Sequence, residues 1–313
     1  MDNQFLKDVV SGLRRKPKKL SSKYFYDEIG DALFQRIMNS EEYYLTNCEF
    51  EIFEERSDEI AETFINHLQS FDLIELGAGD ATKTSFLLEA LTAKAADFSY
   101  MPIDISSSMI NYLEEELPKK IPGLKITGLN GEYFPMVKRA NEISKRKKAV
   151  LFLGGNIGNL TPEEAQTFLS ELRSNLNDGD VVLVGFDLKK NPHVIIAAYN
   201  DRSGYTKAFN LNLLTRINNE LGANFNLSAF EHYNSYDPLT GACKSFLVSL
   251  AEQDVTVQDL VFHFELNEVI DMEISQKYAL DEIDNLAVQA NFKTIEKFFD
   301  SKNWFLDTLW QVK

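Results

Sequence analysis

The sequence predicts an α/β protein built on a largely parallel β-sheet, and two observations carry this prediction. From about Phe71 onward, short apolar runs alternate with amphipathic runs, which is the pattern of consecutive β-α-β units. Residues 71–76 then read as a buried strand that ends in a glycine turn, and residues 98–103 read as the next strand, followed by Asp104. Open sheets of this kind bind their ligands at the carboxyl ends of the strands.

The same pattern predicts the other elements in order. A helix is expected over 82–94 and another over 107–117, which Ser106 or Ser107 can cap. Further strands are expected at 124–129, 149–153 and 181–186. Thr161-Pro162-Glu163-Glu164 predicts a helix start, because it joins a cap residue, a proline and acids in the first turn. Residues 194–221 read as one or two helices, 232–278 as strands, and 292–298 with 304–310 as a closing hairpin.

The turn after the first strand indicates the kind of ligand. Gly77 and Gly79 allow backbone to approach a ligand where a Cβ would collide. Asp104 lies where a carboxylate can accept both hydroxyls of a ribose. The third glycine of the dinucleotide fingerprint is missing, because Thr82 follows Asp80-Ala81. A pyrophosphate cradle is therefore not expected, and the sequence favours a cofactor without phosphates, S-adenosylmethionine (SAM).

A closing hairpin on a parallel sheet is the usual end of a class I, Rossmann-like methyltransferase. The fold class expected is therefore α/β, a class I methyltransferase sheet with an inserted α+β substrate-binding domain. We place the SAM-dependent methyltransferase domain at 52–190 and 278–313. The substrate-binding domain takes residues 1–51 and 191–277, because the helical, tyrosine-rich N-terminus has no place in the sheet.

The charge of the chain narrows the class of substrate. Lys and Arg total 32 against 48 Asp and Glu, a formal net charge of −16, whereas enzymes of nucleic acids usually present a basic face. The two basic clusters, 14–19 and 145–148, are short and far apart. An acidic protein suits a small cationic or zwitterionic substrate and a sulfonium cofactor. We expect a small-molecule substrate of this kind and no nucleic-acid partner.

The cysteines, the histidines and the apolar residues limit where the protein is expected in the cell and which cofactors it is expected to hold. Two cysteines, Cys48 and Cys243, give no disulfide framework, and the N-terminus lacks the apolar core of a signal peptide. No apolar run could span a bilayer, so we expect a cytoplasmic protein without a membrane partner, and a monomer. No two histidines have helical ligand spacing, so no metal site is expected.

Several stretches together resemble the histidine-specific Nα-methyltransferases of ergothioneine biosynthesis. The resemblance runs from about Pro17 to the C-terminus. The stretches are Lys23-Tyr-Phe-Tyr-Asp27, Glu42-Tyr-Tyr-Leu-Thr46, Glu75-Leu-Gly-Ala-Gly79, Lys83-Thr84, Pro102-Ile-Asp104, Leu153-Gly-Gly-Asn-Ile-Gly-Asn-Leu160, Asp187-Leu188, Ala198-Tyr199-Asn200-Asp201, Phe209-Asn210 and Met272-Glu-Ile-Ser-Gln-Lys-Tyr278.

The resemblance implies an activity and a set of site residues. Members of the family methylate the α-amino group of histidine three times with SAM, which gives hercynine. Carried over by position, the implied cofactor contacts are Gly77, Lys83, Asp104, Glu132 and Tyr133. The implied contacts of the amino-acid head group are Tyr43, Asn159 and Tyr199, and those of the imidazole are Glu273 and Ser275. Tyr26 and Phe34 are implied as walls around the reacting amine, which Tyr26 and Asn159 would orient for catalysis.

The residues themselves leave some of these roles open. Glu273 and Ser275 alternate on a predicted strand and so share a face, which suits an imidazole but also an ordinary edge strand. Asn159 could cap the next helix, a role that Thr161 can already fill. Lys83 near a helix N-terminus opposes the helix dipole, so a carboxylate partner is plausible, and the methionine part of the cofactor has one. A solvent-facing Lys83 side chain is the alternative. Tyr199 could equally be a helix core residue.

One departure bears on the substrate. Family members commonly have Ile-Glu-Met where this chain has Cys243-Lys244-Ser245. Serine in place of methionine would open space beside the side-chain pocket and make it more polar. An N-methyltransferase for another amino acid, such as tryptophan or an indole derivative, is therefore an alternative, and a SAM-binding protein without turnover is a second. The number of methyl groups added, the oligomeric state and the end product of the pathway stay open.

Overall fold

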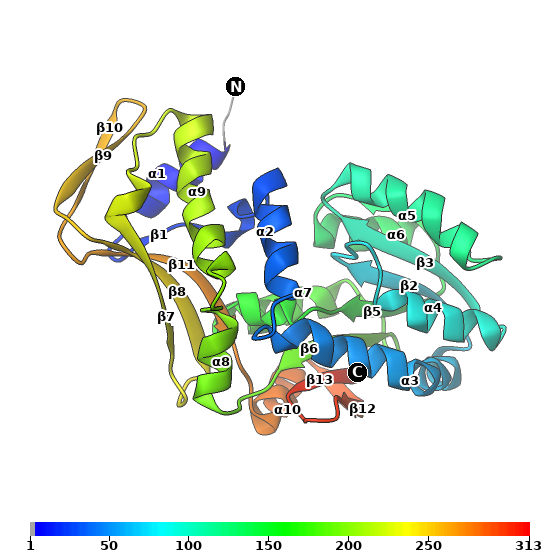
Figure 1. The fold of residues 1–313 in the computed structure, drawn as a ribbon. Coiled ribbons are helices and arrows are strands. Elements are labelled where there is room, and N and C mark those ends of the chain that lie inside the picture. Colours follow the sequence, from blue (N-terminus) through cyan, green and yellow to red (C-terminus); the bar gives the residue numbers. More distant parts are fainter. Residues whose placement is uncertain (1–3) are drawn as a thin grey trace. The chain divides into compact units, whose positions relative to one another are not determined.

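The computed structural model describes residues 4–313, and the chain forms two compact units. Unit 1 consists of Met1–Tyr44 and Lys190–Ser275, and unit 2 of Leu45–Lys189 and Gln276–Lys313 (Figure 1). The boundaries expected from the sequence were 51/52, 190/191 and 277/278. The first one differs most, because a single helix, α3 (Tyr44–Leu68), runs through the expected boundary.

Unit 2 contains a seven-stranded sheet in the order β12-β13-β6-β5-β2-β3-β4. Its strands are β2 (Ser70–Leu76), β3 (Asp97–Asp104), β4 (Leu129–Asn130), β5 (Lys147–Phe152), β6 (Val181–Asp187), β12 (Phe292–Phe299) and β13 (Phe305–Val312). The central strands are parallel, with Leu73 beside Tyr100 and Ala149, while β13 runs antiparallel to β6 and to β12. The predicted strands and the closing hairpin are confirmed apart from the third strand.

The third strand was predicted over 124–129, and this prediction is wrong in length. Only Leu129–Asn130 pairs as a strand, and Ile126 forms a single bridge to Tyr100. The segment leaves the ladder at Gly128, whose N–H donates to the Glu114 carboxylate at 2.7 Å. Two residues of an edge strand therefore remain where the periodicity suggested six.

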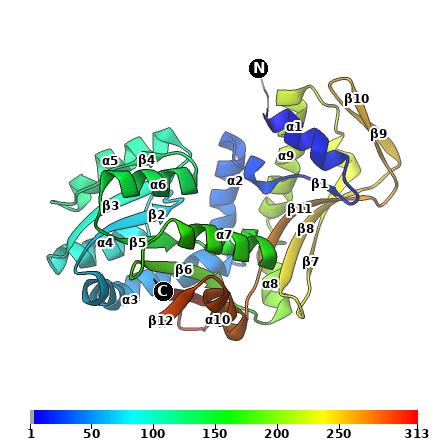
Figure 2. The same ribbon diagram turned by 180° about the vertical axis from the view of Figure 1, so that it is seen from behind.

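Helices cover both faces of this sheet. They are α3, α4 (Thr84–Ala93), α5 (Ser107–Lys120), α6 (Tyr133–Ile143), α7 (Pro162–Ser174) and α10 (Leu280–Gln289), with the 3-10 helix η2 (Asn156–Asn159) after β5. On one face α6, α7 and α10 share an apolar core with the sheet, including Trp310 and Phe186 (Figure 2). The predicted capping box at Thr161 is present, and Ser106 caps α5.

Unit 1 combines helices with a second sheet of order β1-β11-β8-β7 and a separate hairpin, β9-β10. Its helices are α1 (Gln4–Leu13), α2 (Glu28–Met38), α8 (Pro192–Ala198) and α9 (Tyr205–Leu221), with the 3-10 helices η1 (Ser22–Tyr24) and η3 (Leu227–Ala229). Its strands are β1 (Lys18–Lys19), β7 (Phe230–Tyr236), β8 (Ala242–Ser249), β9 (Gln253–Val257), β10 (Leu260–Phe264) and β11 (Val269–Gln276). The N-terminal segment joins this sheet, since Lys18 pairs with Ile270. Phe25, Phe209 and Phe264 lie in its core.

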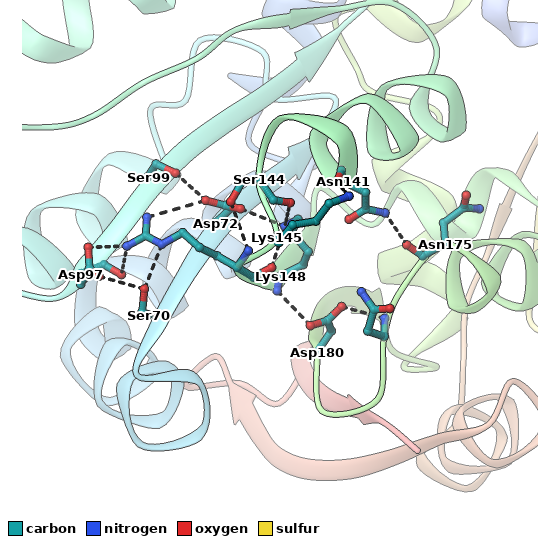
Figure 3. A network of polar contacts seen from close by, with 12 residues as sticks. Ser70, Asp72, Asp97, Ser99, Asn141, Ser144, Lys145, Lys148, Asn175 and Asp180 are labelled. Carbon is teal, nitrogen blue, oxygen red and sulfur yellow. Dashed lines mark hydrogen bonds and ion pairs between the residues drawn. The ribbon is translucent and has the colours of Figure 1, made fainter.

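A buried ion pair holds the amino-terminal edge of the unit 2 sheet. Lys148 Nζ lies 2.9 Å from Asp72 Oδ2, and both side chains are 1% exposed. Figure 3 shows the surrounding network, in which Ser99 donates to Asp72 at 2.7 Å and Asp180 accepts the Lys148 N–H at 3.0 Å. Burial opposes the ionised acid, but hydrogen bonds from Ser99 and Lys148 hold the pKa of Asp72 below its ordinary value. The network joins β2, β3 and β5.

We predict that Lys148→Met lowers the free energy of unfolding by about 3–5 kcal/mol, because it leaves the Asp72 carboxylate buried without its cation. Urea unfolding at pH 7 measures the change. Asp72→Asn/Lys148→Met should recover part of the loss, since the double variant buries no unpaired charge. The exposed Lys145→Met is the control, with an effect within about 0.5 kcal/mol. A Lys148→Met protein as stable as the control would contradict this account of the network.

Candidate functional site

The predicted glycine turn follows β2 and has the backbone that glycine requires. Gly77 and Gly79 have φ of +72° and +52°, in the left-handed region. A Cβ on Gly77 would lie 2.8 Å from the Tyr133 hydroxyl, whereas a Cβ on Gly79 would meet no atom within 4 Å. The turn therefore presents bare backbone at Gly79, which fits the close approach of a ligand.

Asp104 ties the tip of β3 to this turn. Its carboxylate accepts the Ser106 N–H at 2.8 Å, and the Gly79 N–H lies 3.4 Å from its other oxygen. Its carbonyl accepts from the Gly131 N–H and from the Asn130 amide, each at 3.0 Å. Asp104 is only half-buried, so its carboxylate also has a solvent-facing side. The acid predicted for a ribose thus stands beside the glycine turn.

The Glu75 carboxyl group, which the sequence analysis did not single out, ties together the elements around the glycine turn. Glu75, on β2, is buried and accepts hydrogen bonds from the hydroxyls of Thr84 and Tyr100. Thr84 begins α4 and Tyr100 lies on β3, so one side chain joins three elements. Burial raises the pKa of Glu75 to about 7, although these hydrogen bonds favour the charged form. The signal in the sequence was an acid between the apolar residues Ile74 and Leu76 of a strand that is buried along most of its length.

Glu132 and Tyr133 stand at the start of α6. Glu132 is the exposed N-cap residue, and the Tyr133 ring packs edge-on against Phe152, with centroids 6.1 Å apart. Because the Tyr133 hydroxyl lies against Gly77, the aromatic side chain reaches the glycine turn. Burial raises the pKa of Tyr133, so the phenol is neutral at physiological pH. Tyr133 therefore lies next to the turn, and Glu132 precedes it as the N-cap of α6.

Lys83 has a carboxylate partner, and that partner is Glu49 on α3. The two side chains form an ion pair, with Glu49 buried and a quarter of the Lys83 side chain exposed. Glu49 also accepts the Gly154 N–H at 2.7 Å, at the end of β5. Sequence reasoning missed Glu49, because it lies 34 residues before Lys83 in a helix with many acids. Burial lowers the pKa of Lys83 to about 8, although the charge of Asp307 acts in the opposite direction.

Asn159 ends the short helix η2 and is exposed. The position before it must be glycine, since a Cβ on Gly158 would lie 2.9 Å from the Gln276 carbonyl oxygen. Asn159 does not cap the next helix, because Thr161 fills that role by accepting the Glu164 N–H at 3.3 Å. The competing structural role for Asn159 is thereby removed.

In unit 1, an aromatic group gathers three rings around α2 and α9. Tyr26 lies edge-on to Phe34 and Phe209, with centroids 5.6 and 5.7 Å apart, and Phe34 and Phe209 are 5.8 Å apart. Tyr26 is 46% exposed, so this group has an open side. Phe209 was not predicted as a site residue, although Phe209-Asn210 was among the stretches that carry the resemblance.

The residue next to Tyr26 anchors this group. Asp27 caps α2 by accepting the Gly30 N–H at 2.7 Å, and it accepts from the Asn212 amide at 2.8 Å. Asn212 lies on α9, as does Phe209. One carboxylate thus fixes the chain at Tyr26 to both helices that supply the other two rings.

Tyr199 links the aromatic group to the strand that was predicted to read the substrate side chain. Its hydroxyl lies 2.6 Å from the Ser275 hydroxyl on β11, and both residues are buried. Its ring is 6.1 Å from that of Tyr43, which in turn is 6.4 Å from Phe34. Unit 1 therefore brings five predicted site residues and Phe209 into one continuous series of contacts. The predicted ones are Tyr26, Phe34, Tyr43, Tyr199 and Ser275.

Glu273 and Ser245 lie on neighbouring strands of the unit 1 sheet. Glu273 is half-buried on β11, and Ser245 is 2% exposed on β8, paired with Asn234 of β7. β11 and β8 are adjacent in the sheet, and Lys244 pairs with Asp271 at 3.2 Å across them. Ser245 thus lies on the buried side of a strand next to the one that carries Glu273.

Comparison with known proteins decides the family. A family described as "Histidine-specific methyltransferase, SAM-dependent" matches residues 5–312. The chain belongs to this family. It is therefore a SAM-dependent methyltransferase, and the predicted fold class and cofactor are confirmed.

Relatives of this histidine-specific methyltransferase carry related names. Histidine N-alpha-methyltransferase of Mycobacterium tuberculosis is 34% identical over 275 residues, which cover 87% of this chain and 84% of that protein. The protein of the same name from Mycolicibacterium smegmatis is 35% identical over 274 residues, with the same coverage. Ergothioneine biosynthesis protein 1 of Schizosaccharomyces pombe is 29% identical over 286 residues, 90% of this chain but 37% of that protein.

Solved structures with some likeness are also methyltransferases. One from Clostridium acetobutylicum is 15% identical, with a TM-score of 0.44 over 83% of this chain and 92% of that one. Magnesium protoporphyrin IX methyltransferase of Synechocystis is 12% identical, with a TM-score of 0.45 over 93% and 98% of the two chains.

Residues 4–313 offer neither a metal centre nor a membrane span. Within them no three His, Cys, Asp or Glu side chains are grouped so as to hold a metal ion. None of the helices in this range is long and apolar enough to cross a bilayer.

Proposed function

We propose that this methyltransferase transfers methyl groups from SAM to the α-amino group of L-histidine, three times in succession, to give hercynine. The observation that carries the proposal is the hydrogen bond between Tyr199 and Ser275, which joins a head-group residue to a side-chain residue within one family-matched unit. Ergothioneine biosynthesis is the pathway that the names of the relatives suggest.

The residues of unit 2 fit SAM. Gly79 offers bare backbone, Asp104 offers a half-exposed carboxylate for ribose hydroxyls, and Glu132 with Tyr133 offers an acceptor and an aromatic face for adenine. The partly exposed Lys83 would bind the carboxylate of the methionine part. SAM, when bound, supplies an electrophilic methyl group on a sulfonium sulfur.

The residues of unit 1 suit an amino acid whose amine becomes a cation. We assign Tyr43 and Tyr199 to the head group and Glu273 and Ser275 to the imidazole. One ring N–H would donate to the Glu273 carboxylate, and the Ser275 hydroxyl can donate to or accept from the other nitrogen. Tyr26 with Phe34 and Phe209 would face the growing ammonium, which aromatic rings stabilise.

Methyl transfer to a neutral amine depends more on the geometry of the reacting atoms than on a strong base. The nitrogen lone pair must point at the methyl carbon in line with the breaking carbon–sulfur bond, and the electron pair of that bond stays on sulfur. Asn159 and Tyr26 would orient the lone pair, since an amide oxygen and a phenol oxygen can each accept an N–H. The α-ammonium group of free histidine first loses one proton to water, which gives the neutral amine that reacts. The first two transfers each release a further proton from nitrogen to water, and the third yields a quaternary ammonium with none to lose.

The first test is mass spectrometry after incubation of the protein with SAM and each of the twenty amino acids, without added metal. We expect histidine alone to gain methyl groups, up to three. Reactions without SAM serve as the control. A mass gain on another amino acid with none on histidine would contradict the proposal, and no gain on any, with SAM bound, would indicate a SAM-binding protein without turnover.

An N-methyltransferase for tryptophan or an indole derivative is the second candidate. The buried Ser245, in place of the methionine common in the family, is the observation that favours it. One relative, 4-dimethylallyltryptophan N-methyltransferase of Claviceps fusiformis, is 29% identical over 216 residues, 66% of this chain and 59% of that protein. Glu273 together with Ser275 argues for histidine. The indole N–H could also donate to the Glu273 carboxylate, but an indole has no second ring nitrogen for the Ser275 hydroxyl.

Glu273→Ala should lower kcat/KM for histidine by roughly ten- to a hundred-fold, since a hydrogen bond to a charged group contributes about 1.5–3 kcal/mol. SAM affinity should stay nearly unchanged, and the preference for histidine over tryptophan should fall. The measurement is the ratio of the two kcat/KM values in wild type and variant. Asp271→Ala, which removes another carboxylate of β11 that already pairs with Lys244, is the matched control. If this ratio is the same in Glu273→Ala as in wild type, β11 is not part of the side-chain pocket, which would contradict the proposal.

A further inference from the structure

Two buried acids converge where β6 and β13 pair in unit 2. Gly185 on β6 lies directly opposite Asp307 on β13. A Cβ on Gly185 would lie 2.5 Å from Glu49 Oε1 and 3.0 Å from Asp307 Oδ1. Both carboxyl groups therefore occupy the space above this glycine, and any larger residue at 185 would displace them.

The two acids differ in their partners. Glu49 accepts the Gly154 N–H and pairs with Lys83. Asp307 is 0% exposed, and neither of its carboxyl oxygens has a hydrogen-bond partner among residues 4–313. Burial of an ionised carboxylate without a hydrogen-bond partner costs free energy, and such a carboxylate usually takes up a proton. Burial raises the pKa of Asp307 to about 7, while the Lys83 charge acts in the opposite direction.

The charged groups around Asp307 are few in the described part of unit 2. Glu49 faces it from α3, and Lys83 faces it from the start of α4. Its neighbours across the sheet, Gly185 and Phe298, carry no charge. The next charged pair along β6 is already closed, since Lys277 Nζ lies 2.7 Å from Asp187. The cluster that matters is thus Glu49, Lys83 and Asp307.

Protonation of Asp307 changes the balance of this cluster. With Asp307 neutral, one cation faces one anion, and the ammonium of Lys83 can share its hydrogen bonds with another carboxylate. With Asp307 ionised, two buried anions compete for the same cation. Lys83 is the member of the cluster with a partly exposed side chain, at 25%, whereas Glu49 and Asp307 are buried. The proton on Asp307 therefore decides how strongly the cluster retains Lys83.

We propose that Asp307 is a positioning residue for Lys83: in its neutral form it leaves the Lys83 ammonium available to the carboxylate of SAM, and in its ionised form it holds Lys83 against β13. This inference rests on the proposed role of Lys83 as a cofactor contact. It adds a residue that the resemblance did not imply, and it makes cofactor affinity depend on a proton that takes no part in methyl transfer.

Calorimetry of SAM binding between pH 6 and 7.5 tests the inference in wild type and in Asp307→Asn. We expect wild-type affinity to fall by roughly three- to ten-fold more than that of the variant as the pH rises through 7. The amino group of SAM also titrates in this range, so the difference between the two proteins is the quantity of interest. Burial lowers the pKa of Lys83 to about 8, so the two proteins are compared between pH 6 and 7.5, where Lys83 keeps its charge. Glu296→Gln, an exposed acid on β12, is the control and should follow wild type.

A second readout reports Asp307 itself. A carboxyl whose pKa is raised on folding stabilises the protein less as the pH rises above its unfolded value of about 3.8. Asp307→Asn should therefore gain stability relative to wild type between pH 5 and pH 8.5 in urea unfolding. If the asparagine variant does not fold, Asp307→Leu removes the same titration and serves for both measurements.

The outcomes separate the two proposals. Equal pH slopes for wild type and Asp307→Asn, or a wild type that tightens with pH relative to the variant, would overturn the role of Asp307. Lys83→Met tests the underlying assignment, and we expect at least ten-fold weaker SAM binding at pH 6. If Lys83→Met binds SAM as wild type does, the cofactor role of Lys83 fails, whatever Asp307 does.

Discussion

The glycine turn of unit 2 and the residues beside it depend on one buried carboxyl group, that of Glu75. It accepts hydrogen bonds from two hydroxyl groups. Thr84 is the first residue of α4, and Tyr100 lies on β3. A single side chain therefore sets the spacing of the elements on either side of the glycine turn. Asp104 adds a second tie at the tip of β3, through its contact with the Gly79 N–H. The bare backbone at Gly79 is useful to a ligand only because these acids hold the surrounding chain in place.

The candidate substrate residues of unit 1 are organised in a different way, by aromatic packing and one hydroxyl pair. Asp27 fixes Tyr26 between α2 and α9, and the rings of Phe34 and Phe209 complete an apolar group with one open side. The Tyr199–Ser275 hydrogen bond then connects the aromatic series to β11. Such a combination suits a small zwitterion that carries a polar ring at one end and becomes a quaternary ammonium at the other.

Much of the fold and part of the site could be predicted from the sequence, because they depend on local patterns. The strand, turn and helix around Gly77 follow from residue type and period, and the capping box at Thr161 is a four-residue signal. The length of the strand predicted at 124–129 was overestimated, because the Gly128 N–H donates to the Glu114 carboxylate and not to a neighbouring strand. Glu49, Phe209 and Asp307 were missed for another reason: each acts through a partner far away in the chain, which no periodicity reveals.

The central claim is that this histidine-specific methyltransferase modifies the α-amino nitrogen. It is tested most directly by supplying SAM with a ¹³C-labelled methyl group, together with histidine, and reading the product by NMR. The account predicts that all labelled methyl groups are attached to the α-nitrogen, and that at completion they form one trimethylammonium signal beside an unmodified imidazole. Labelled methyl groups on a ring nitrogen, with the α-amine unchanged, would contradict it.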